Sequence, residues 1–296
     1  MKKIGLVIDS HVGLTEVEAN KKGIGFIPLN VFLGDKPYLS GVNITSEQIE
    51  KAQLANNKLK VSTSSPDGEN IEKGYDWALK RYEKVVVLSM SYKFSGTNNA
   101  LKLIAEDPKY KNKVFVYNSL YVAPWSTLLL EDIIEIVENA TSVKRIFKLL
   151  DQQNGIQEGY ICPENIYWFY NGGRISKAQY ITGSIMKIFP ILTVKDGFID
   201  QTKVAKIRTK KRAFKTIAKM VRELKEKYDQ EGIEYDFGIL LSNDKEANKL
   251  SLNTLAEEFG IKIKDIKATR LGPVQVAHMG PNGFGMCLIA KFKEKK

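Results

Sequence analysis

The sequence has 296 residues, more than one hydrophobic core usually covers, so two domains are expected. Its 43% of hydrophobic and 27% of charged residues are ordinary for a globular protein and argue against disorder. The formal net charge is +11, but only seven of the 45 basic residues are Arg and the lysines are scattered along nearly every helical segment, so we expect a solvated surface and no nucleic-acid partner.

Three short runs rich in β-branched residues lie in the first half of the chain, and each ends in a small polar residue. They cover residues 3–10, 84–91 and 113–119. A helical pattern follows at least two of them, which is typical of a parallel α/β sheet. In such sheets the loops after the strands build the ligand site, so Asp9-Ser10, residues 91–97 and Asn118-Ser119 are expected to converge.

Two helices are expected to close the first half of the chain. One covers about residues 124–138, and the other begins near Thr141-Ser142, two residue types that favour a helix N-cap. The pattern changes beyond Gly155, and the sequence then predicts two strands joined by a turn at Asp196-Gly197. A basic amphipathic helix is expected next, over about residues 210–227.

A strand-helix-strand unit and a final strand are predicted to complete the second half, which gives it some antiparallel pairing. The fold class expected is therefore α/β with two domains. Residues 1–156 would carry a mostly parallel sheet, and residues 157–296 would carry a mixed, partly antiparallel sheet.

Hydroxyl side chains gather where the second predicted strand ends. Ser89, Ser91, Ser95 and Thr97 lie within nine residues, just before a helical pattern. Such residues often serve only to cap the helix. A bound anion is the alternative, because the positive end of the helix is near and Gly96 would let a ligand approach the backbone. Neither GxxxxGK[ST] nor GxGxxG occurs, so a nucleotide site is not favoured.

Three further segments offer polar groups whose roles remain open at this stage. The run "VSTSSPDGEN" contains Thr63 and is typical of a turn with a helix cap, although it could help to bind a carboxylate. His278 lies in "LGPVQVAHMGPNGFG", where glycines and prolines predict a tight loop, and it would either contact a ligand or bond the loop. Arg174 follows two glycines in "NGGRIS", which fits a helix C-cap or a close contact with a neighbour.

A stand-alone serine hydrolase or acyltransferase that uses Ser95 and His278 is the enzymatic alternative. Ser95, His278 and Asp9 would supply its three side chains, but the GxSxG motif is absent.

Membrane spans and disulfides are not expected. No uninterrupted apolar stretch approaches the roughly 18 residues of a membrane span. Cys162 and Cys287 lack the spacing of a zinc site and predict two buried reduced thiols. These features favour a cytoplasmic location.

Seven ordered segments together resemble the DegV family over almost the whole chain. They are "IDS" (8–10), "PLNVFLGDKPYLSGVNIT" (28–45), "TSSP" (63–66), "SYKFSGT" (91–97), "NGGRIS" (171–176), "KIRTKKRA" (206–213) and "GPVQVAHMGP" (272–281). The family comprises fatty-acid-binding proteins, including the acyl-carrying subunit of bacterial fatty acid kinase.

The resemblance implies a long acyl chain in an apolar tunnel at the domain boundary, with its carboxylate held by Thr63 and Ser95. His278 would reach the same head group, and Arg208 would lie beside it. The remaining candidate contacts to the head group or a partner are Ser91, Gly96, Thr97 and Arg174. A separate ATP-binding kinase subunit would phosphorylate the bound fatty acid, so this chain would be a carrier with no cofactor or nucleotide site and no catalytic residues of its own.

The sequence also departs from the family pattern at the expected head-group loops. Asn118 replaces an Asp, Ser65 replaces a Gln, and Met279 follows His278 in place of a Thr. Residues 121–125 are bulky where small residues are usual. The apolar segment 180–194 is expected to cover either the lipid or the core. The basic run at 210–212 is suited to brief contact with an anionic membrane or with an acidic kinase surface.

Overall fold

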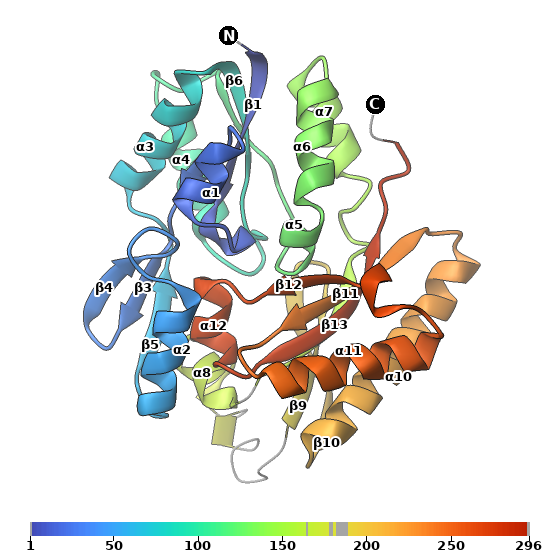
Figure 1. The fold of residues 1–296 in the computed structure, drawn as a ribbon. Helices are drawn as coiled ribbons and strands as arrows, with labels where there is room; N and C mark the ends of the chain where they lie inside the picture. Colours follow the sequence, from blue (N-terminus) through green and yellow to red (C-terminus); the bar gives the residue numbers. More distant parts are fainter. Residues whose placement is uncertain (1, 164, 178–179, 182–188, 295–296) are drawn as a thin grey trace.

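The computed structural model describes residues 2–163, 165–177, 180–181 and 189–294. Figure 1 shows the first half of the chain, in blue to green, mostly above the second half, in yellow to red. The described strands form three sheets, of four, six and three strands. This is the predicted α/β class, although the three-stranded sheet was not expected.

The four-stranded sheet is parallel throughout, and its inner strands are buried on both faces. Its strands, in spatial order, are β2 (Gly25–Ile27), β1 (Lys2–Asp9), β6 (Tyr82–Leu88) and β7 (Val114–Val116). Alternate residues of β6 belong to different clusters of the core: Val85 and Val87 face one side, and Val86 and Leu88 face the other. Burial on both faces explains the unbroken apolar run in the sequence.

Helices cover both faces of the parallel sheet. They are α1 (Glu16–Lys21), α3 (Gly68–Leu79), α4 (Thr97–Ala105), α5 (Trp125–Leu128), α6 (Leu130–Asn139) and α7 (Val143–Leu150), with a short 3-10 turn, η1 (Ser10–Val12), after β1. Of the predicted N-cap pair Thr141-Ser142, Ser142 is the cap, because its side chain accepts a hydrogen bond from Arg145 N. The single helix predicted over 124–138 is instead two helices, α5 and α6, broken at Leu129.

The six-stranded sheet is mixed, as predicted. Its strands, in spatial order, are β10 (Phe198–Ile207), β9 (Phe189–Lys195), β8 (Glu158–Cys162), β13 (Phe284–Ala290), β11 (Tyr235–Leu241) and β12 (Lys267–Arg270). Only β11 and β12 pair in parallel. The turn predicted between β9 and β10 is confirmed, with positive φ at Asp196 (50°) and Gly197 (75°), as a type I′ hairpin requires.

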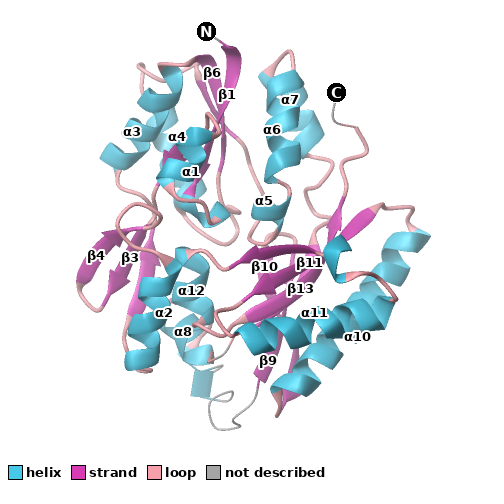
Figure 2. Cartoon of the chain, in the orientation of Figure 1, coloured by secondary structure: helices cyan, strands magenta, loops and turns pink. Residues whose placement is uncertain are grey.

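Two long helices cover one face of this sheet (Figure 2). They are α10 (Lys210–Gln230) and α11 (Lys245–Phe259), and a 3-10 turn, η2 (Ile263–Asp265), follows α11. The buried side chains of α10 recur at helical spacing, at Phe214, Ile217, Val221 and Leu224, which is why a lysine-rich sequence folds as a helix with one apolar face.

The small antiparallel sheet lies beside three helices of the lower part of Figure 1. Its strands are β4 (Lys36–Leu39), β3 (Asn30–Leu33) and β5 (Val61–Ser64), and the helices are α2 (Ser46–Ala55), α8 (Ile166–Asn171) and α12 (Pro273–Met279). The sequence prediction of a tight loop around His278 is wrong, since residues 273–279 are helical. Pro273 occupies the first turn and Gly280 the C-cap, so both residues bound a helix.

One hydrophobic core cluster joins the two halves of the chain. It runs from Ile8 in β1 through α5, α6 and α7 to Leu192 and Cys287 in the mixed sheet. Trp125 Nε1 of α5 donates to Leu288 O across this junction, at 2.9 Å. The predicted division between 156 and 157 falls in the segment that separates α7 from β8, and it stays a prediction.

Candidate functional site

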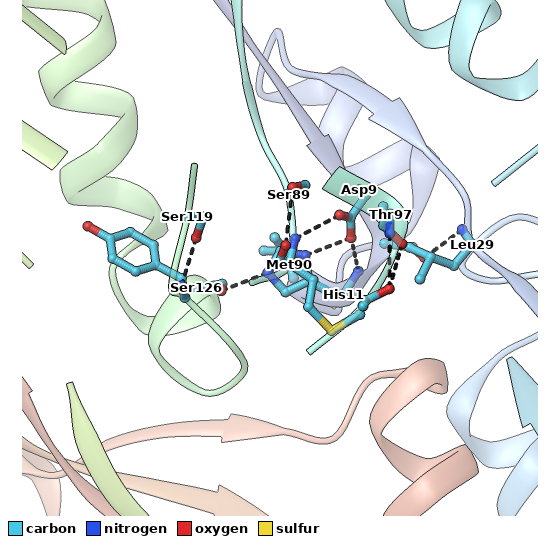
Figure 3. A network of polar contacts seen from close by, with 12 residues as sticks. Asp9, His11, Leu29, Ser89, Met90, Thr97, Ser119 and Ser126 are labelled. Carbon is cyan, nitrogen blue, oxygen red and sulfur yellow. Dashed lines mark hydrogen bonds and ion pairs between the residues drawn. The ribbon is translucent and has the colours of Figure 1, made fainter. Parts of the chain in front are cut away.

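The loops after the parallel strands do converge, as the sequence predicted. Asp9 accepts a hydrogen bond from Met90 N at 2.9 Å, and Tyr92 N donates to Ser119 O at 3.3 Å. Asn98 of α4 adds a second tie between these loops, donating to Ser89 Oγ at 2.9 Å and to the carbonyl of Tyr117 at 2.8 Å. Figure 3 shows how the buried polar side chains at this sheet edge bond one another. The edge is therefore held by internal bonds.

Thr63 and His278 meet although they are 215 positions apart in the sequence. Thr63 lies near the end of β5 and His278 on α12, and Thr63 Oγ1 is 2.9 Å from His278 Nε2. His278 is only 6% exposed, and burial lowers its pKa to about 3, with the positive charge of Arg174 as a second cause. The imidazole is therefore neutral at physiological pH and carries a single N–H.

The other ring nitrogen of His278 has no hydrogen-bond partner among the described residues. It faces the backbone of Gly172, where a Cβ would lie 2.1 Å from Nδ1. A side chain at position 172 would push the imidazole aside, so the glycine of the "NGGRIS" turn that caps α8 leaves room for the ring. Gly172 is the C-cap of α8, which confirms the predicted cap.

Ser95 lies on a neighbouring loop and already takes part in local bonds. Its hydroxyl is 2.9 Å from Thr97 Oγ1 and accepts from Thr97 N at 3.2 Å, at the start of α4. Ser95 therefore bonds the first residue of α4, which fits the helix-capping role that the sequence left open as an alternative to anion binding. A Cβ on the exposed Gly96 would lie 3.7 Å from Ser65 Oγ, so this loop and the "TSSP" loop are adjacent.

An apolar cavity adjoins His278 and is lined from both halves of the chain. Its lining comprises Met90, Phe94, Val122, Ala123, Ile161, Phe169, Val194, Ile199, Leu240, Val274, Gln275, His278 and Met279. Its volume of about 60 Å³ holds a few water molecules and is far too small for a long acyl chain. An acyl chain could enter only if lining side chains moved. Of the apolar segment 180–194, which was expected to cover either the lipid or the core, residues 182–188 lie outside the described residues.

Arg174 is the predicted arginine that lies nearest to this site. It is half-buried, its guanidinium donates to Gly172 O, and it acts electrostatically on His278. Arg208 is instead exposed between β10 and α10, and within the described ranges no hydrogen bond or ion pair joins it to Thr63 or His278. Ser91 is fully buried and faces the hairpin turn at Gly197. The structure thus groups Arg174, but neither Arg208 nor Ser91, with the Thr63–His278 pair.

The serine-hydrolase trio proposed from the sequence does not form. Asp9 bonds His11, whereas His278 bonds Thr63. A different chain of bonds, missed by the sequence, links Asp9 Oδ1 to His11 Nδ1 at 2.6 Å and His11 Nε2 to Ser126 Oγ at 2.7 Å (Figure 3). All three side chains are 0% exposed, so no substrate reaches this Ser-His-Asp arrangement as it stands. The Asp-x-His spacing after β1 was its only local signal.

The positions that depart from the family pattern have structural roles. Asn118 accepts a hydrogen bond from Lys102, and Met279 lines the apolar cavity beside His278. Tyr121 and Trp125 are both buried and donate hydrogen bonds to backbone carbonyls, so the bulky stretch packs in the core around Val122 and Ala123, which line the cavity.

Other kinds of site find no support in the part of the chain that the structure describes. Its histidine, cysteine and carboxylate side chains form no group of three that could hold a metal ion. None of its helices has the length and apolarity needed to cross a membrane. Cys162 and Cys287 are buried free thiols, as predicted, and burial raises the pKa of each thiol.

Comparisons of the sequence and of the structure with known proteins both match proteins of the DegV family. The model of the DegV family, described as uncharacterised proteins, matches residues 3–291. A DegV domain-containing protein of Mycoplasmopsis pulmonis is 29% identical over 261 residues, which are 88% of this chain and 86% of that protein.

Solved structures share the fold. A fatty-acid-binding DegV family protein from Thermus thermophilus is 24% identical, with a TM-score of 0.81 and coverage of 98% of this chain and 100% of the other. A stearic-acid-binding protein from Eubacterium ventriosum is 21% identical, with a TM-score of 0.83 and 99% of each chain covered. With the family model matching nearly the full length, the chain belongs to the DegV family.

Proposed function

We propose that this protein binds a long-chain fatty acid between its two halves, residues 1–156 and 157–296, which we take as its domains. Thr63 and Ser95 hold the carboxylate, and the hydrocarbon occupies the apolar cavity. The observation that carries the proposal is the pairing of Thr63 with a buried, neutral His278 that also lines this cavity. The fatty-acid-binding relatives of the same fold support it.

The neutral imidazole decides which group donates and which accepts in the hydrogen bond between His278 and Thr63. When Nε2 carries the proton, it donates to Thr63 Oγ1, and the hydroxyl proton of Thr63 is then available for a carboxylate oxygen. Ser95 lies on the adjacent loop and supplies a second hydroxyl. Hydrogen bonds to a carboxylate are charge-assisted and stronger than neutral ones. Half-buried Arg174 contributes positive charge nearby.

Affinity comes mainly from the hydrocarbon. Each buried CH₂ contributes about 0.8 kcal/mol, so sixteen carbons supply far more than two hydroxyls do. The cavity has to widen to hold them, and its lining includes the adaptable side chains of Met90 and Met279. The hydroxyls then fix which end of the ligand faces outward.

The protein acts as a carrier in this proposal and catalyses no reaction itself. A separate ATP-binding kinase subunit phosphorylates the presented carboxylate in the cytoplasm, and the exposed Arg208 and the basic start of α10 form the contact surface for that subunit or, briefly, for an anionic membrane. Addition of purified fatty acid kinase subunit and ATP to the loaded protein should yield acyl phosphate, and neither protein alone should do so.

Mass spectrometry under non-denaturing conditions tests the binding step. Protein purified without added lipid should carry a mass excess that extraction identifies as a fatty acid. Thr63→Val and Ser95→Ala should each lower its retention, whereas Thr254→Val should not, because Thr254 bonds only within its own helix α11. Unchanged retention in both site variants would refute the head-group assignment, and a protein that takes up no fatty acid would refute the proposal itself.

A further inference from the structure

A second cavity lies between the two halves, and it is polar. It has a volume of about 330 Å³ and is lined by the loop before α1, by the start of α2, and by the ends of β11 and β12 with the residues that follow β12. Four charged side chains line it: Glu18, Glu47, Glu50 and Arg270. α12 contributes only Pro273, which is uncharged. None of the residues proposed for the fatty acid belongs to this lining, which we call the Glu50 cleft.

Glu50 is the one carboxylate of the cleft that is buried without a partner. It is 5% exposed, and among the residues that the structure describes it forms no hydrogen bond or ion pair. The other carboxylates are engaged: Glu18 accepts from Thr15 at the start of α1, and Glu47 lies 3.9 Å from Arg270. Because burial of an unpaired carboxylate is costly, a proton or a cation at Glu50 would lower that cost.

Three of the hydroxyl groups that line the Glu50 cleft present acceptors to it. Ser46 donates its proton to Leu271 O at 2.8 Å, and Thr127 donates to Val12 O at 2.6 Å. Thr269 likewise donates to a backbone carbonyl, that of Arg270, at 3.4 Å. Each of these hydroxyl protons is used, so only the oxygen lone pairs remain free to accept. A ligand rich in N–H donors would satisfy these three oxygens.

The charge of the cleft is opposite in sign to the net charge of the protein. With all groups ionised, its lining holds three carboxylates and one arginine, in a chain whose formal net charge is +11. Anions are attracted to most of this surface, whereas the cleft favours a cation. Since the described residues form no group of metal-binding side chains, an organic cation fits better than a metal ion.

We propose that the Glu50 cleft binds a small molecule through a primary ammonium group, which pairs with the Glu50 carboxylate and donates to the surrounding hydroxyl oxygens. An ammonium carries three donors and no acceptor, which matches the Glu50 carboxylate and these three hydroxyl oxygens. The volume lies at the lower end of small-molecule sites, so the ligand is compact. The proposal is independent of the fatty acid.

The cleft also has a built-in pH dependence. Burial, and secondarily the charge of Glu47, raises the pKa of Glu50 to about 7, and Arg270 opposes the shift. The ionised fraction of Glu50 then falls from about 0.9 at pH 8 to about 0.1 at pH 6. Ammonium binding should therefore be about tenfold weaker at pH 6 than at pH 8.

Calorimetric titration of the full chain with 1,4-diaminobutane tests the proposal, with 1,4-butanediol as the uncharged control and about 0.15 M salt to screen surface charge. The diamine should bind at pH 8 and about tenfold more weakly at pH 6, and the diol should not bind. Glu50→Gln should abolish the tight binding and its pH dependence. Glu47→Gln, which removes an exposed carboxylate from the same helix, should keep the pH dependence.

A second measurement needs no variant. The side-chain carboxyl signal of Glu50 in a carbon-13 NMR titration should report a lower pKa when diamine is bound, because the ammonium stabilises the ionised form. Equal binding by wild type and Glu50→Gln, equal affinity for the diol, or a Glu50 pKa that the diamine leaves unchanged would overturn the proposal.

Discussion

The two histidines of this protein are both buried and hydrogen-bonded, but they differ in how many of their ring nitrogens have a partner. His11 is bonded at both ring nitrogens, to Asp9 and to Ser126, and all three side chains are 0% exposed. His278 is bonded at Nε2 only, to a Thr63 that is itself partly exposed. The first network is closed, whereas the second ends in a hydroxyl that is partly exposed.

This difference concerns which polar groups remain available to a ligand. Asp9 and Ser126 look like parts of a catalytic triad, but every group there is occupied and no substrate can approach. The Thr63–His278 pair has fewer bonds and adjoins an apolar cavity. A buried polar group with an unused bond costs stability, so its presence at a cavity points to a ligand.

Breaking the closed network should have the largest effect on stability. Asp9→Ala would leave His11 Nδ1, His11 N and Met90 N without their acceptor, so unfolding free energy should fall by about 3–5 kcal/mol. Urea denaturation measures this, with the exposed Asp35→Ala as control. The folded fraction should still retain fatty acid. Loss of retention with little loss of stability would mean that this network serves the ligand.

Acid should lower the stability of the protein through His278, the histidine of the second network. Its folded-state pKa of about 3 lies below the ordinary 6.5, so the unfolded chain binds the extra proton first as the pH falls. Its contribution to stability is therefore complete above pH 6.5 and is lost between 6.5 and 3, at up to about 1.4 kcal/mol per pH unit. Denaturation at several pH values should show a flatter slope for His278→Gln than for wild type. Identical slopes would mean that His278 is not buried as a neutral ring.

A methyl group beside His278 should test its orientation directly. Gly172→Ala places a Cβ 2.1 Å from His278 Nδ1, and the ring would have to leave its bond to Thr63. The cost should be about 1–3 kcal/mol of stability together with weaker fatty-acid retention. Gly68→Ala is the matched control, since its Cβ makes only an ordinary contact of 3.7 Å. Full retention in Gly172→Ala would show that the head group does not depend on this histidine.

Local patterns predicted the regular elements well. The parallel strands, the N-cap Ser142 and the Asp196-Gly197 turn each rest on neighbouring residues, and each is confirmed. The helix α12 was missed because Gly272, Pro273 and the Gly280-Pro281 pair were interpreted as loop signals. The order of these residues, with proline at the first turn and glycine at the end, is the one that bounds a helix.

The site depends on contacts that no local pattern contains. Thr63 and His278 are 215 positions apart, and only the resemblance to the DegV family grouped them before the structure did. The same resemblance placed Arg208 near the head group, which the described contacts do not support. The small sheet β3-β4-β5 and the Glu50 cleft also arise from distant segments, and neither was predicted.

The comparison of closed and open networks extends to Glu50, where the smallest effect is expected. Its pKa of about 7 exceeds the ordinary 4.5, so between these values the folded state holds a proton that the unfolded state has lost, and stability falls as the pH rises. At about pH 8 and above, nearly the whole penalty is present. Glu50→Gln removes it, and should raise unfolding free energy at pH 8 by on the order of 1 kcal/mol, since water in the cleft screens the charge. At pH 5 the gain should nearly vanish. An equal gain in stability at both pH values would mean that the gain comes from packing. A loss of stability at pH 8 would show that the Glu50 carboxylate has a partner. Glu50 would then belong with the closed network of His11.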